Sequence, residues 1–128
     1  MIDHVDHIVL TTRDLPGCMR FYCDVLGMKA EKFQTPTETR LALKFGNQKI
    51  NVHEWGREFT PRAHVAAPGT LDLCFIASTS LEKVIEKLQQ SNIRIIDGPV
   101  MKTGATSKIR SVYVRDPDLN LVEISVPV

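Results

Sequence analysis

Eight side chains in this sequence have types and spacing suited to a metal or acid–base site. If polar and apolar residues alternate along short strands, all eight fall on one face: His7, Asn51, His53, Asp72, Cys74, Ser111, Tyr113 and Glu123. Imidazole and carboxylate groups bind divalent ions and transfer protons. Strands hold their side chains rigidly enough to preorganise such a site.

The first half of the chain predicts a strand, a helix and three strands. Residues 6–11 alternate as a strand, and Asp14 can begin a helix with Pro16 in its first turn. Gly27 supplies a left-handed end to that helix. Alternating apolar residues then predict strands at 28–33, 40–45 and 49–55.

The second half repeats this order after a segment rich in proline and glycine. Residues 71–76 alternate as a strand, and Thr79 with Glu82 forms a capping box for a helix that Asn92 can end. Further strands are predicted at 93–96, 109–115 and 121–126. The glycine-bearing segment 97–108 reads as a loop.

The order of the elements amounts to an internal repeat, because Asp72 follows His7 by the same interval as Asn92 follows Gly27. We therefore predict a single α+β domain built from two modules, about 1–56 and 70–128, with a linker at 57–69. The apolar face of the strands should form the core with the helices, through Ile8, Leu10, Ile50, Val52, Leu71, Leu73, Phe75, Val122 and Ile124.

Length and charge narrow the classes of partner. The 128 residues suffice for one domain, and the net charge of +1 gives no basic excess for nucleic acid or an anionic membrane. The three cysteines form no CxxC pair and no even disulfide framework. With no signal-peptide pattern at the start, we expect a cytoplasmic protein acting on a small molecule.

Two segments carry a resemblance to a known family. DHIVLTTRDLPGCMRFYCDVLGM and YVRDPDLNLVEIS resemble the vicinal oxygen chelate superfamily of glyoxalases, bleomycin-resistance proteins, fosfomycin-resistance enzymes and extradiol dioxygenases. The most similar group is the glyoxalase domain-containing protein 5 type, through LALKFGNQKINVHEWGREFTPRA and PGTLDLCFI. The resemblance implies two βαβββ modules around a concave mixed sheet, and a homodimer.

The resemblance also implies a divalent metal bound by the first and last strand of each module. The corresponding positions here are His7, Asn51, Asp72 and Glu123. Asp72 stands where histidine is more usual, and Asn51 stands where some members have a carboxylate and others no ligand. We predict His7, Asp72 and Glu123 as ligands of Mn²⁺, Fe²⁺, Ni²⁺, Co²⁺ or Zn²⁺.

The remaining polar residues are predicted to handle the substrate. Asn51, Ser111 and Tyr113 are expected to contact it, Glu123 to act also as a base, and His53 to be a general acid/base or a fourth ligand. The structural alternatives are a backbone hydrogen bond for His53 and an ion pair for Asp72. The structural alternative for Cys74 is a small buried side chain. Trp55 and Phe59 either form the wall of a pocket or anchor the linker.

Several functions fit this pattern. The leading one is a metal-dependent lyase or isomerase of the lactoylglutathione lyase type, acting on a molecule with adjacent oxygens. A fosfomycin-modifying enzyme is a second interpretation, although Val9 replaces the threonine common there. An extradiol dioxygenase needs two histidines and a carboxylate, against which Asp72 counts. The non-enzymatic alternative is a metal-free, ligand-sequestering protein of the bleomycin-resistance kind.

Overall fold

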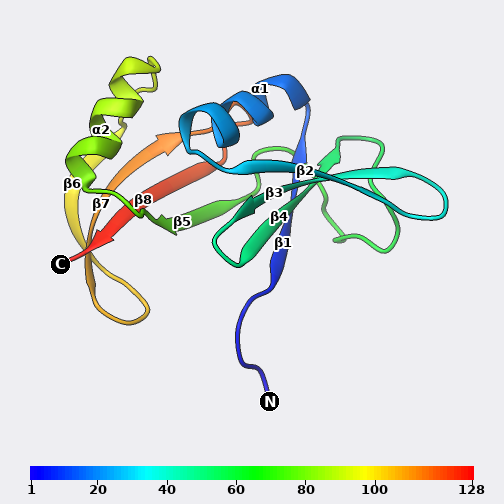
Figure 1. The fold of residues 1–128 in the computed structure, drawn as a ribbon, viewed down its shortest axis with the longest axis horizontal. Helices are drawn as coiled ribbons and strands as arrows, with labels where there is room; N and C mark the ends of the chain where they lie inside the picture. Colours follow the sequence, from blue (N-terminus) through cyan, green and yellow to red (C-terminus); the bar gives the residue numbers. More distant parts are fainter. The chain divides into compact units, whose positions relative to one another are not determined.

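The computed structural model describes residues 1–128 and separates into two units, Met1–Thr70 and Leu71–Val128. Unit 1 contains β1 (His7–Thr12), α1 (Leu15–Met19), the π-helix η1 (Arg20–Val25), β2 (Lys29–Gln34), β3 (Thr39–Phe45) and β4 (Gln48–Glu54). Unit 2 contains β5 (Asp72–Ile76), α2 (Leu81–Gln90), β6 (Asp97–Thr103), β7 (Lys108–Arg115) and β8 (Leu121–Pro127) (Figure 1). The predicted α+β class and the βαβββ order are confirmed.

Each unit forms one four-stranded sheet in which the first strand lies beside the last. The strand orders are β1-β4-β3-β2 and β5-β8-β7-β6. The β1–β4 and β5–β8 pairs are parallel, and the other pairs are antiparallel. Residues that lie opposite each other in the first and last strands of a unit therefore point to the same face of its sheet.

The first helix begins and ends as predicted but changes its winding. The Asp14 carboxylate accepts a hydrogen bond from Gly17 N at 3.0 Å, and Pro16 lies in the first turn. The helix continues as η1, where Leu26 N donates to Phe21 O five residues earlier at 3.0 Å. Gly27 then has φ +81°, a left-handed conformation that favours glycine.

The second helix begins one residue later than the predicted capping box required. The Thr79–Glu82 box is wrong, because Ser80 is the cap and its Oγ accepts from Lys83 N at 3.3 Å. Ser80 has extended backbone angles directly before Leu81, which is the geometry of an N-cap. Asn92, with φ +57°, follows the end of α2 as predicted. The helix packs against β7 and β8.

The strand predicted at 93–96 is wrong, and β6 lies in the segment expected to be a loop. A register shift separates Asp97 from Val100, as in a β-bulge. Gly98 has φ +96°, and a Cβ there would lie 2.4 Å from Ser111 O. Glycine is therefore required by the close approach of β7, and an edge strand tolerates the following Pro99.

The apolar face of each sheet is the more buried one, as predicted. Leu10, Ile50, Val52, Val122 and Ile124 are buried, whereas Ile8, Leu71, Leu73 and Phe75 are half-buried. Most of the half-buried members belong to β1 and β5, which are edge strands with a neighbour on one side only. No helix has the length and hydropathy that crossing a membrane would require.

A buried polar turn joins β7 to β8. The Asp116 carboxylate accepts from Asp118 N and Asn120 N through Oδ1, both at 2.9 Å, and from Asn120 Nδ2 through Oδ2 at 2.8 Å. Asn120 Oδ1 accepts from Leu71 N at 2.9 Å, which ties the turn to the start of unit 2. Leu119 has φ +68°, so a branched side chain occupies a left-handed position.

Candidate functional site

The predicted residues of unit 1 share one face of its sheet. In the parallel β1–β4 pair, His7 lies opposite Lys49, Val9 opposite Asn51 and Thr11 opposite His53. Because alternate residues of a strand share a face, His7, Asn51 and His53 point to the same side. The exposure of these side chains differs, since His7 is exposed and His53 is buried.

His7 is oriented by its sequence neighbour. Its Nδ1 lies 2.7 Å from Asp6 Oδ1, and this hydrogen bond is the main reason why the pKa of Asp6 is below its usual range. An ionised carboxylate only accepts, so Nδ1 donates to Asp6, and Nε2 is the ring nitrogen that remains for another contact. A carboxylate behind a histidine in this way is the usual arrangement around a metal-bound imidazole.

Three buried polar atoms of unit 1 have no hydrogen-bond partner. They are Arg40 Nε, Asn51 Oδ1 and His53 Nδ1. Asn51 and His53 share a face of β4, and Arg40 lies two residues before Ala42, which faces Asn51 directly. Buried polar atoms are nearly always paired, so three unpaired atoms on one face indicate a place prepared for a polar ligand or water.

Phe59, from the predicted linker, packs over this group. Its ring lies edge-on to His53 with centroids 5.1 Å apart, and the Arg40 guanidinium stacks on it at 4.3 Å. Burial, and then the positive charge of Arg40, hold the pKa of His53 below 6.5. The imidazole is therefore neutral at pH 7.

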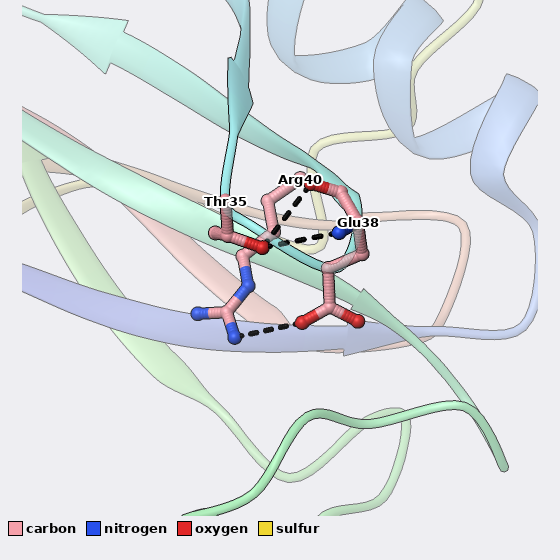
Figure 2. Close-up of polar contacts among 3 residues, drawn as sticks. All are labelled: Thr35, Glu38 and Arg40. Atoms are coloured by element: carbon pink, nitrogen blue, oxygen red, sulfur yellow. Dashed lines mark hydrogen bonds and ion pairs between the residues drawn. The ribbon is translucent and has the colours of Figure 1, made fainter.

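Arg40 is held from its other side by a short turn. Its Nη2 donates to Glu38 Oε1 at 3.0 Å, and Thr35 Oγ1 contacts both the N–H and the carbonyl oxygen of Glu38 at 3.2 Å (Figure 2). The β2–β3 turn thus positions Glu38, and Glu38 positions Arg40. These contacts use only part of the five-donor guanidinium group.

A cavity of about 190 Å³ lies at the end of β3 and β4. The pairing between β3 and β4 ends at Leu41 and Val52; beyond these residues β3 pairs only with β2, and β4 only with β1. These strand ends contribute to the lining of the cavity, which consists of Leu15, Thr39, Arg40, Leu41, Val52, Glu54, Arg57 and Phe59.

The predicted residues of unit 2 also share a face. Cys74 lies opposite Glu123 in the parallel β5–β8 pair, and Tyr113 lies opposite Glu123 in the antiparallel β7–β8 pair. Asp72 lies on the same side two residues before Cys74. Cys74 is exposed rather than buried as expected, because β5 is an edge strand of the sheet.

Glu123 is the centre of a hydroxyl cluster. Its Oε2 accepts from Ser111 Oγ at 2.6 Å and from Ser125 Oγ at 3.3 Å, and the two serine oxygens are 2.7 Å apart. Cys74 Sγ lies 3.4 Å from Ser125 Oγ. Burial, together with a hydrogen bond to Glu123, raises the pKa of Tyr113 to about 12, so its hydroxyl stays protonated at neutral pH.

The predicted site residues thus form two sets, with His7, Asn51 and His53 in unit 1 and Asp72, Ser111, Tyr113 and Glu123 in unit 2. No group of three or more histidine, cysteine, aspartate or glutamate side chains in the structure is arranged to hold a metal ion. Sequence reasoning missed Arg40. Its position on the face of Asn51 was available from strand alternation, but its stacking on Phe59 was not.

Comparison with known proteins gives the family. A model of the Glyoxalase/Bleomycin resistance protein/Dioxygenase superfamily matches residues 4–124. Virulence protein STM3117 of Salmonella typhimurium is 50% identical over 125 residues, which cover 98% of this chain and 85% of that protein. Its crystal structure superposes with a TM-score of 0.94 at 49% identity, covering 100% of this chain and 99% of that one.

Two further relatives cover nearly the whole chain. Glyoxalase domain-containing protein RDO1 of Mycosarcoma maydis is 46% identical over 121 residues, which are 94% of this chain and 66% of that protein. An integron cassette protein from the mobile metagenome of V. cholerae has a TM-score of 0.92 at 47% identity, with coverage of 98% and 96%. The chain therefore belongs to the glyoxalase/bleomycin resistance protein/dioxygenase superfamily.

Proposed function

We propose that the protein is a metal-dependent, glyoxalase-like lyase or isomerase acting on a small molecule with adjacent oxygens. The observation that carries the proposal is the Glu123 cluster, in which a carboxylate lies among the hydroxyls of Ser111, Ser125 and Tyr113. Membership of the superfamily and 46% identity to a glyoxalase domain-containing protein support it. We also propose that the chain is of the glyoxalase domain-containing protein 5 type.

The chemistry of the donor set fits a divalent ion. His7 offers Nε2, because Asp6 holds Nδ1. Both serine hydroxyls bind the same oxygen of Glu123, so neither engages Oε1. Asp72 is exposed on the same face as Glu123. We propose these three residues as ligands of Mn²⁺, Fe²⁺, Ni²⁺, Co²⁺ or Zn²⁺, since one imidazole and two carboxylates suit such ions.

Each polar residue then has a distinct role. A bound divalent ion would act as a Lewis acid towards the substrate oxygens. Glu123 would take the proton from one substrate carbon and return it to the adjacent carbon, and the protonated Tyr113 hydroxyl donates a hydrogen bond to a substrate oxygen. His53, which is neutral at pH 7, would accept the proton of the substrate hydroxyl and return it to the oxygen of the former carbonyl group. Asn51 and Ser111 orient the substrate.

We further propose that the protein works as a homodimer in the cytoplasm. Proteins of this superfamily commonly form dimers and bind small molecules. None of the three cysteines forms a disulfide, which agrees with a reducing compartment.

Elemental analysis of the purified protein is the first test. We expect one divalent ion per chain, lost in His7→Ala and in Glu123→Ala and retained in the control variants His64→Ala and Glu86→Ala, whose side chains are exposed. The metal-loaded protein should then isomerise the hemithioacetal of methylglyoxal and glutathione, or another 2-oxoaldehyde adduct. Stoichiometric metal without any such turnover would reject the lyase assignment and keep the metal site.

A metal-free protein that sequesters its ligand is the second candidate. The Glu123 cluster also supports this function, because the hydroxyls of Ser111, Ser125 and Tyr113 provide hydrogen bonds to the Glu123 carboxylate without a cation. This function predicts no bound metal after reconstitution with each of the five ions. It also predicts no change in metal content between the wild type and Glu123→Ala.

A further inference from the structure

The cavity at the end of β3 and β4 is separate from the proposed metal and substrate residues, none of which lines it. Val52 and Glu54 alternate along β4 with Asn51 and His53, so they point to the opposite face of the sheet. Thr39 and Leu41 of β3 share that face, because Leu41 lies opposite Val52, and Leu15 of α1 joins them. The cavity is therefore a second candidate binding place, on the face that carries the first helix.

The body of the cavity is apolar. The pairing of β3 with β4 ends at Leu41 and Val52, and the segment after β4 brings Phe59 to the place where the strands part. With Leu15 these residues form four apolar walls, which offer water no hydrogen bonds. A cavity of roughly 150 Å³ with leucine, isoleucine and phenylalanine walls in another protein binds benzene. The 190 Å³ available here accommodate an aromatic ring.

The polar side chains at the cavity differ in whether they are already engaged. Thr39 Oγ1 and Arg40 Nη2 form hydrogen bonds of 2.7 and 3.0 Å with β2 and with the β2–β3 turn. Glu54 Oε2 and Arg57 Nη1 are 3.8 Å apart, which is an ion pair but too long for a hydrogen bond. The carboxylate of Glu54 and the guanidinium of Arg57 are therefore available to a molecule in the cavity. We call these two residues the rim pair.

We propose that this cavity binds a small neutral aromatic carboxamide. Its ring packs against the four apolar walls, its N–H donates to Glu54, and its carbonyl oxygen accepts from Arg57. A carboxylate in the same place would bring a second negative charge to Glu54, and an ammonium group a second positive charge to Arg57. A hydroxyl would have to reach both side chains with one oxygen, whereas a carboxamide reaches each with its own atom. The inference goes beyond the proposed function and does not depend on it.

Phe59 connects the cavity to a residue that can report its occupancy. The same ring that forms one wall lies edge-on to His53, with the centroids 5.1 Å apart. A molecule that packs against Phe59 changes the position or the dynamics of this ring. The ring signals of His53 should therefore respond to binding, although His53 does not line the cavity.

Titration of the purified protein with benzamide tests the proposal. NMR follows the backbone amides and the His53 ring, and we expect the largest shifts at Leu15, Leu41, Val52 and Phe59. Toluene lacks the polar group, benzoate carries a negative charge, and benzylamine is protonated at pH 7. Each of these three probes should bind at least about tenfold more weakly than benzamide, because each loses a hydrogen bond or meets a like charge.

Variants separate the apolar body of the site from its rim. Leu15→Phe fills the cavity and should abolish benzamide binding. Glu54→Gln leaves Arg57 without its counter-charge, so benzoate should bind at least about tenfold more tightly than it binds to the wild type. Arg57→Gln should improve the binding of benzylamine in the same way. Glu82→Gln is the matched control, because it makes the same charge change in the exposed ion pair with Arg110, and it should change none of these affinities.

The possible results are distinct from those for the metal site. Benzamide binding that is lost in Leu15→Phe, with the expected changes in the two rim variants, supports the inference whatever the metal content or turnover. Glu123→Ala should bind benzamide as the wild type does. The rim variants decide alone if Leu15→Phe does not fold, since Glu54 and Arg57 are exposed.

Three results would overturn the proposal. No shift with any of the four probes would leave the cavity to water. Binding that persists in a folded Leu15→Phe variant would place the molecule elsewhere. Equal binding of benzamide and toluene, or rim variants that behave as Glu82→Gln does, would mean that the rim pair does not recognise the carboxamide.

Discussion

Replacing Leu119 by glycine is expected to stabilise unit 2 by about 0.5–1 kcal/mol. A non-glycine residue at φ +68° carries about 1–2 kcal/mol of strain, which glycine does not have. Glycine loses more backbone entropy on folding, which costs about 0.5–1 kcal/mol. The leucine side chain is 67% exposed, so its removal sacrifices little apolar burial. The relief of backbone strain therefore outweighs the added loss of entropy.

Urea unfolding of the wild type, Leu119→Gly and Leu119→Ala measures this difference. Alanine is the matched control, because it removes the side chain but keeps the Cβ that causes the strain. We expect the midpoint to rise for glycine and to stay or fall for alanine. A lower midpoint for Leu119→Gly, or an equal rise for both variants, would refute the claim that this turn stores backbone strain.

Three further perturbations follow from the polar contacts. The pKa of His53 is lowered in the folded state, so the unfolded chain binds a proton at this residue more readily as the pH falls below 6.5. The free energy of unfolding should therefore decrease below that pH, and His53→Gln should weaken this pH dependence. Urea unfolding at about pH 5 and pH 7.5 measures both effects. Asp116→Ala should cost about 3 kcal/mol in the same assay, because two backbone N–H groups and the Asn120 amide lose their acceptor in a buried turn. Ser111→Ala should cost about 1–2 kcal/mol, because it removes the 2.6 Å hydrogen bond to Glu123; an unchanged unfolding midpoint would mean that Ser125 alone satisfies the carboxylate.

Strand alternation was the most reliable guide to the site. It placed Glu123 beside Ser111 and Tyr113, and His53 beside Asn51, because the face of a strand residue depends only on parity once the strand is recognised. Local sequence signals also gave the helix boundaries at Asp14, Gly27 and Asn92, since capping is a local property of one or two residues.

The errors came from contacts between distant parts of the chain. Gly98 and Pro99 look like strand breakers, yet β6 forms around them because Gly98 fits against the backbone of β7. The group of Arg40 and Phe59 depends on how the predicted linker folds back onto β3 and β4. Neither the direction of a linker nor its burial is encoded in local periodicity.

The parallel pairing of β1 with β4, and of β5 with β8, has a consequence for folding. In each unit the first strand of the sequence, β1 or β5, has only one neighbour, and that neighbour is the last strand of the unit, β4 or β8. Closing such a long loop is entropically costly, so these pairs should form late and open early. His7 and Asp72 lie on these late strands. Hydrogen exchange should accordingly be faster in β1 and β5 than in β4 and β8, and His7 and Asp72 should be released before Glu123 when the chain begins to unfold.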